Sequence, residues 1–212
     1  MNEETVPEFS LLIALTLVIG GYLLGSLLPA EWFMRHKTGH SAQELEENPG
    51  GAGTYRKAGF VAAAFVTIFD IGKGLLPVAL ADRFSLSGGW LIAAACAPAV
   101  GHNWPIYKGF RGGGKGLASV LGAAVWLGWP SILPGLGVGA ALVLWKRWAP
   151  WIGVAGLPLG LLGMAAAGVE ASRIGAVIAL LLVMLLRLIP WFFEQRQARQ
   201  KTGKFIPPNK SW

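Results

Sequence analysis

The chain has 212 residues, of which 54% are hydrophobic and only 14% are charged, whereas about a quarter of the residues in soluble domains are charged. The apolar residues stand in long blocks, which excludes an ordinary soluble domain and indicates a membrane protein. The formal net charge of +7 suits nucleic acid, acidic lipid or a phosphorylated substrate, so the positions of the basic residues must decide between them.

The first apolar stretch covers residues 9–28 and follows an acidic N-terminus. A secretory signal would begin with basic residues and would have a shorter apolar core. We therefore expect a retained first membrane helix over residues 9–34.

A glycine-rich stretch lies in the loop at residues 35–59 and includes Asn48, Gly50 and Arg56. Glycines let the backbone approach a ligand closely, and an arginine can bind a phosphate through two parallel hydrogen bonds. Taken alone, this stretch is a turn-rich loop. It becomes a candidate phosphate site because we expect it on the same membrane side as a second glycine loop further along the chain.

The second apolar segment, residues 60–82, contains Asp70 and Lys73. Charges inside a membrane segment are costly and usually face the protein interior or a polar cavity. Two residues three apart share one face of a helix, so these side chains can pair with each other. A structural ion pair and a supporting role at a substrate site are equally compatible with the sequence.

The third apolar segment, residues 88–104, contains the single cysteine, Cys96, and has His102 near its end. A single cysteine excludes a disulfide within the chain and a cysteine-based metal site.

A glycine loop follows the third apolar segment, in which Arg111 and Lys115 flank three glycines. Successive backbone amides in such a loop, at the start of a helix, suit a phosphate. The spacing differs from the nucleotide P-loop, because glycine rather than serine or threonine follows Lys115. A flexible basic loop is the alternative interpretation.

Four further apolar segments are predicted, at residues 116–129, 131–146, 150–169 and 173–193. Their dense glycines and alanines are typical of membrane helices that pack closely. The prolines at positions 130 and 134 mark either a tight turn between the fourth and fifth apolar segments or a kink in one longer element. We expect about seven spans, and five would fit equally well if the middle pair were re-entrant. The basic tail at residues 194–212 is expected to lie on the cytoplasmic membrane surface.

The distribution of basic residues predicts the topology. If the N-terminus lies outside, most lysines and arginines fall in inner loops, and only Arg83 and Arg173 fall in outer ones, which is the positive-inside pattern. We therefore expect an all-α, polytopic integral membrane helical bundle of about seven transmembrane helices, with a cytoplasmic C-terminus, in the cell inner membrane. Residues 1–212 would form a single membrane domain, with the site in inner loops 35–59 and 105–116.

Several motifs occur in a characteristic order: Gly21-Tyr22-Leu23-Leu24-Gly25-Ser26, Asn48-Pro49-Gly50 with Arg56 and Gly59, Asp70-Ile71-x-Lys73-Gly74-x-x-Pro77, Gly101-His102-x-x-Pro105, and Gly109-Phe110-Arg111 followed by Gly-Lys-Gly. In order and spacing they resemble the bacterial acyl-phosphate-dependent glycerol-3-phosphate acyltransferase family, over most of residues 20–122. The resemblance implies transfer of a fatty acyl group from acyl phosphate to glycerol 3-phosphate, which gives lysophosphatidate for phospholipid biosynthesis without a cofactor.

The resemblance and the chemistry of the residues together predict three groups of site residues. The predicted catalytic residues are Lys115, Arg56 and His102. The predicted phosphate-binding residues are Asn48, Gly50, Arg111, Gly112, Gly113, Gly114 and Gly116. Asp70 and Lys73 are predicted to support them. The expected partners are acyl phosphate, glycerol 3-phosphate and membrane lipids.

An alternative function comes from departures from the family pattern. Glu46 and Glu47 replace a serine and a glycine of the family's first motif, and Pro150 and Gly153 stand where the family has serines. These changes favour a non-catalytic membrane protein that binds or transports a phospholipid or a phosphorylated metabolite.

Binding of nucleic acid is not expected, because the basic residues are scattered over short membrane loops. Nor is a metal expected, because no dense ligand set surrounds the loop histidines.

Overall fold

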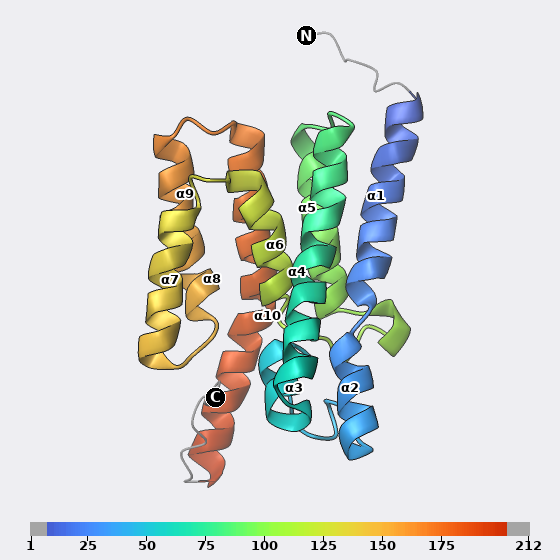
Figure 1. The fold of residues 1–212 in the computed structure, drawn as a ribbon, viewed down its shortest axis with the longest axis vertical. Coiled ribbons are helices and arrows are strands. Elements are labelled where there is room, and N and C mark those ends of the chain that lie inside the picture. The colour runs from blue at the N-terminus through green and yellow to red at the C-terminus, as the bar shows by residue number, and fades with distance from the viewer. Residues whose placement is uncertain (1–7, 203–212) are drawn as a thin grey trace.

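The computed structural model describes residues 8–202, and all regular structure within this range is helical. The elements are α1 (Glu8–Ser26), α2 (Pro29–Thr38), α3 (Gly51–Ala58), α4 (Phe60–Arg83), α5 (Gly88–Asn103), the 3₁₀ turn η1 (Ile106–Lys108), α6 (Leu117–Gly128), α7 (Leu133–Lys146), α8 (Trp151–Val154), α9 (Gly156–Ala166) and α10 (Ala171–Thr202). The longer helices run side by side along the long axis of the molecule (Figure 1). The prediction of an all-α bundle is confirmed.

Two predicted segments are divided in the structure. The first apolar segment breaks between α1 and α2, and the segment at 150–169 consists of α8 and α9. The first break has a local cause. Pro29 has no backbone N–H, so the carbonyl of Gly25, four residues earlier, cannot receive its helical hydrogen bond. Proline is favoured at the first position of a helix, where α2 accordingly begins.

The inner loop predicted at residues 35–59 is partly helical, since it contains the end of α2 and all of α3. The helix predicted to end at residue 193 continues to Thr202, and the remaining ten residues of the predicted basic tail, 203–212, lie outside the described residues. This region is therefore more helical than its glycine and charge content suggested.

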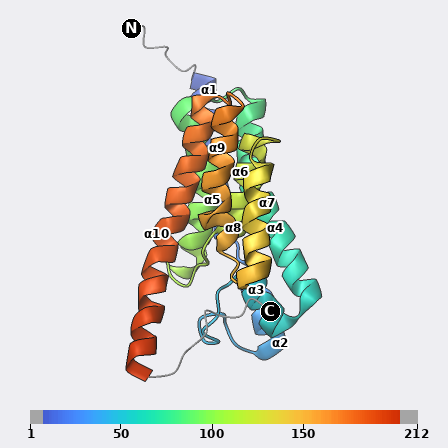
Figure 2. The same cartoon turned by 90° about the vertical axis from the view of Figure 1, so that its left-hand side faces the viewer.

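Three helical stretches within the described residues are long and apolar enough to cross a membrane: Ser10–Thr38, Phe60–Arg83 and Ala171–Pro190. Leu117–Gly128, Leu133–Lys146 and Trp151–Ala166 are shorter apolar helices. The count of about seven crossings remains a prediction. In both views α1 begins at one end of the long axis and α10 finishes at the other (Figures 1 and 2).

Glycines allow two pairs of helices to pack in close contact. A Cβ atom on Gly25 of α1 would lie 2.2 Å from the Pro98 carbonyl oxygen of α5, and one on Gly74 of α4 would lie 2.0 Å from the Ser119 carbonyl oxygen of α6. No side chain fits at these distances, so only glycine permits this spacing. Small residues at helix contacts are the usual means of association in a membrane.

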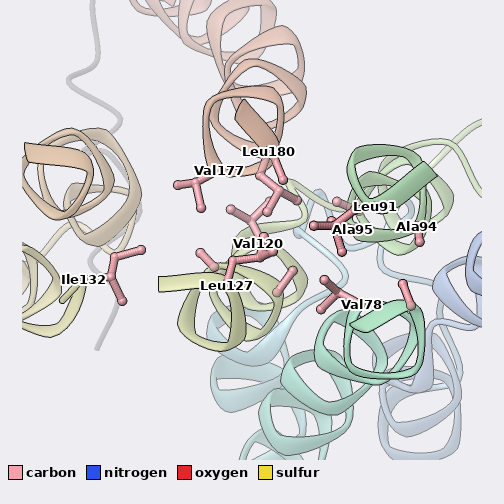
Figure 3. Close-up of a cluster of buried hydrophobic side chains, with 14 of the residues drawn as sticks. Val78, Leu91, Ala94, Ala95, Val120, Leu127, Ile132, Val177 and Leu180 are labelled. Carbon is pink, nitrogen blue, oxygen red and sulfur yellow. The ribbon is translucent and has the colours of Figure 1, made fainter. Parts of the chain in front are cut away.

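An apolar cluster at the centre of the bundle joins four helices. Val78 of α4, Leu91 of α5, Val120 of α6 and Leu180 of α10 are buried and point toward one another (Figure 3). At the end of the bundle where α10 begins, Asp82 accepts hydrogen bonds from Arg173 at 2.6 Å and from the Trp126 indole N–H at 3.1 Å. These contacts fix α4, α5, α6 and α10, whose other ends lead to the candidate site.

Candidate functional site

Asp70 and Lys73 form the ion pair that their spacing predicted, and His102 joins them. Lys73 Nζ lies 2.7 Å from Asp70 Oδ1 and 2.9 Å from His102 Nδ1. All three residues are at most 3% exposed. A buried charge is tolerated when it is paired and hydrogen-bonded, so this group, here called the buried charge cluster, joins α4 to the end of α5.

Lys73 also stabilises the break between α1 and α2. Its ammonium donates to the carbonyl oxygens of Gly25 at 3.0 Å and Leu27 at 2.9 Å. The Gly25 carbonyl is the one that lacks a helical donor because of Pro29. The lysine therefore replaces the missing N–H, and it does so from a position 48 residues away in sequence.

The glycine loop packs directly on His102. His102 Nδ1 faces Lys73, 2.9 Å from its Nζ atom. Nε2 faces Gly114, where a Cβ would lie 2.1 Å from it. The Gly114 N–H donates to the His102 carbonyl oxygen at 3.0 Å. Gly114 therefore provides space for the imidazole, and its amide is engaged within the protein rather than presented to a ligand.

Two cationic side chains hold the carbonyl side of this loop. Lys108, which also pairs with Glu31 of α2, donates to the Gly112 carbonyl oxygen at 3.4 Å. From α10, Arg187 donates to the carbonyl oxygens of Gly113 and Gly114, both at 3.3 Å. Arg187 was not among the site residues predicted from the sequence, although an arginine within an apolar segment is itself a signal of function.

Lys115 lies among other charged groups from separate elements. The side chain is half-buried, and this burial, together with the positive charges of Arg56 and Arg187, lowers its pKa from an ordinary 10.5 to about 7, against an opposing effect of Glu47. Such effects require these groups to be near Lys115. Arg56 of α3, Lys115 before α6 and Arg187 of α10 thus form one group, here called the cation cluster.

The carboxylate of Glu47 is bound by Arg56 within this group. Arg56 donates through Nε to Glu47 Oε1 at 2.9 Å and through Nη2 to Oε2 at 2.5 Å. The Glu47 side chain is only 7% exposed. Its neighbour Glu46 is exposed and has a positive φ of 53°. Of the two carboxylates that distinguish this chain from the family motif, one therefore faces the cation cluster and the other does not.

The other predicted phosphate-binding residues are less closely grouped. Asn48 is half-buried, and its carbonyl oxygen accepts from the Gly50 N–H at 2.8 Å, directly before α3. Gly112 and Gly116 adopt positive φ angles of 65° and 67° in the glycine loop. Arg111 is exposed. The structure therefore brings Arg56 and Lys115 together, places His102 beneath the loop and leaves Arg111 at the surface.

These features define an integral membrane protein: a bundle of apolar helices in which cations from distant segments collect around a glycine loop. The glycerol-3-phosphate acyltransferase family model matches residues 15–200, so the chain belongs to that family. The match extends well past residue 122, beyond the motifs recognised in the sequence.

Similar proteins carry the same description. A glycerol-3-phosphate acyltransferase of Hahella chejuensis is 36% identical over 156 residues, which are 68% of this chain and 78% of the relative. One of Dehalococcoides mccartyi is 38% identical over 109 residues, 50% of this chain and 52% of the relative. The crystal structure of PlsY (YgiH), an integral membrane glycerol 3-phosphate acyltransferase, in its glycerol 3-phosphate form superposes with a TM-score of 0.74 and 27% identity, over 90% of this chain and 92% of that one.

Proposed function

We propose that this protein is a glycerol-3-phosphate acyltransferase of phospholipid biosynthesis that uses acyl phosphate as the acyl donor. The reaction takes place at the cytoplasmic face of the cell inner membrane and gives lysophosphatidate and inorganic phosphate. The observation that supports it most strongly is that Arg187 of α10 binds the loop that carries Lys115, while Arg56 of α3 is close enough for its charge to act on that lysine. Both substrates carry a phosphate group, for which such a cluster is suited.

The reaction needs correct placement of two substrates more than a nucleophile from the protein. A hydroxyl oxygen of glycerol 3-phosphate attacks the acyl carbonyl carbon, and the bond between that carbon and the phosphate oxygen breaks. The hydroxyl proton is transferred to phosphate, which leaves. Arg56 and Lys115 stabilise the negative charge that the departing phosphate acquires. Fixing both reactants in one geometry supplies much of the remaining rate enhancement.

In this proposal the buried charge cluster supports the glycine loop. His102 presses on Gly114, while Asp70 and Lys73 fix the imidazole from beneath. Of the other predicted phosphate-binding residues, Gly112, Gly113 and Gly116 belong to the same loop as Lys115, and Asn48 and Gly50 directly precede α3, which carries Arg56.

The alternative of a non-catalytic binding or transport protein is not favoured, because the family match covers almost the whole chain. Departure from the family motif at Glu47 leaves Arg56 and Lys115 in place.

The proposal is tested with purified, detergent-solubilised full-length protein, palmitoyl phosphate and labelled glycerol 3-phosphate. We expect labelled lysophosphatidate, and we expect Lys115→Met to reduce its formation by about a hundredfold, the usual effect of losing a positioned charge. Lys146→Met is the matched control, since Lys146 is exposed at the end of α7 and should leave turnover unchanged. Absence of product with the wild-type protein, beside an active relative, would refute the enzymatic function.

A further inference from the structure

We propose that Glu47 is an internal anion that competes with substrate phosphate for Arg56 and thereby sets the affinity of the site for phosphorylated substrates. This inference rests on the proposed function, because it identifies what determines affinity at the same site. It concerns a residue at which this chain departs from the family motif.

The contact between Glu47 and Arg56 has the form of a bound phosphate contact. Nε and Nη2 of Arg56 donate in parallel to the two carboxylate oxygens, at 2.9 and 2.5 Å. This pair of donors is the one that binds carboxylates and phosphates alike through two oxygens. A phosphate that binds Arg56 through the same edge must therefore displace the carboxylate.

The position of Glu47 within the cation cluster supports this competition. Its side chain is nearly buried, Lys57 Nζ lies 4.0 Å from it, and its negative charge also acts on Lys115. The carboxylate thus binds Arg56, lies near Lys57 and is close enough to Lys115 for its charge to act on that lysine. It lowers the electrostatic cost of holding these cations together before substrate binds.

The charge of the incoming anion determines whether it replaces the Glu47 carboxylate at Arg56. A phosphate monoester carries up to two negative charges near neutral pH, whereas Glu47 carries one. Exchange of the carboxylate for a dianion therefore increases the attraction to the cation cluster, whereas exchange for a monoanion does not. The carboxylate weakens binding of every anion, but dianions retain a net gain. Glu47 is in this sense a specificity-determining residue.

Movement of Glu47 requires only side-chain rotation. Its backbone N–H is bonded to the Ala42 carbonyl oxygen at 2.8 Å, so the turn that carries it is closed independently of the contact with Arg56. The adjacent Glu46 shares the turn but is exposed. It provides a control that removes the same charge one residue away.

The test measures binding of inorganic phosphate to the full-length protein in detergent by calorimetry, alongside steady-state kinetics. We expect Glu47→Gln to bind phosphate about tenfold more tightly, since loss of a competing charge-assisted contact is worth at least that factor. The KM for glycerol 3-phosphate should fall without an increase in kcat. Glu46→Gln should behave as the wild type. Glu47→Asp keeps the charge but withdraws it from Arg56 by one methylene group, and should give an intermediate affinity even if Glu47→Gln folds poorly.

The outcomes separate this inference from the proposed function. Tighter phosphate binding by Glu47→Gln in a protein without turnover would support the inference and refute the acyltransferase reaction. Unchanged or weaker phosphate binding would overturn the inference, because Glu47 would then orient Arg56 for the ligand instead of competing with it. An equal increase with Glu46→Gln would also overturn it, since net charge alone would then account for the effect.

Discussion

Lys115 is a residue whose charge changes near neutral pH. Its pKa of about 7 in the ligand-free protein means that the ammonium form is complete at low pH and is lost as the pH rises through this value. We expect kcat/KM for glycerol 3-phosphate to decline above about pH 7. Bound phosphate stabilises the ammonium form, so the corresponding decline of kcat should occur at a higher pH.

Lys115→Arg separates this effect from other titrations. Arginine stays protonated throughout the accessible range, so the decline of kcat/KM near pH 7 should disappear, whatever activity remains. Measurement of initial rates between pH 6 and pH 9 in one detergent checks this. The same decline in Lys115→Arg would assign the titration to another group.

Arg187 acts on the loop and on Lys115 at once. Arg187→Met removes two hydrogen bonds to the glycine loop, and we expect kcat/KM to fall by about tenfold or more. The substitution also removes a positive charge that lowers the pKa of Lys115. The decline of kcat/KM above about pH 7 should therefore move to higher pH. Arg187→Lys keeps the positive charge, so the decline of kcat/KM should stay at the wild-type pH. Its kcat/KM should lie between those of Arg187→Met and the wild type, because a lysine cannot donate to both carbonyls in one plane.

The sequence predicted Arg56 and Lys115 as partners but not the residues that act on them. Glycine content and basic charge predict a phosphate loop locally, and the positive-inside pattern predicts that both loops lie on one side of the membrane. The roles of Glu47 and Arg187 depend on how α3 and α10 pack against the loop before α6. No local sequence pattern shows how these helices pack. The sequence does show that Glu47 is a charge at a departure from the family motif and that Arg187 is a charge within an apolar segment.

At the scale of elements, the contact between α1 and α5 leaves no room for a side chain at Gly25. Gly25→Ala places a methyl group 2.2 Å from the Pro98 carbonyl oxygen, which forces the helices apart, and we expect a loss of about 1–3 kcal/mol in stability. Gly20→Ala is the matched control in the same helix, because no atom lies within 4 Å of its Cβ position. Thermal unfolding in detergent should show a lower midpoint for the first variant alone. Equal midpoints would contradict the close contact.

The helix break before Pro29 shows why element boundaries were partly missed. Apart from Glu31, apolar residues continue across positions 27–34, so hydropathy indicates one uninterrupted helix. The break is stabilised by Lys73, which hydropathy of the first segment cannot reveal. By contrast, the predicted starts of α4, α5 and α10 agree with the structure to within about two residues, which is the usual uncertainty of such boundaries.

At the scale of the whole molecule, the predicted topology places the turn between α4 and α5 outside and the turn between α2 and α3 inside. In a Cys96→Ala background, Ser87→Cys should react with a membrane-impermeant maleimide in spheroplasts, and His40→Cys should react only after the membrane is opened. Both positions are exposed. Reaction of both from the same side would reject the predicted orientation.

The depth of the buried charge cluster in the membrane determines how strongly dissolved salt screens its charges. α4 has 24 residues, or about 36 Å, and Lys73 stands roughly 20 Å from its first residue. Phe60, Val61, Phe65 and Ile68 on that stretch are exposed, as expected of side chains that face hydrocarbon. Dissolved ions are excluded from such a layer, so buffer salt screens these charges far less than it screens a surface patch.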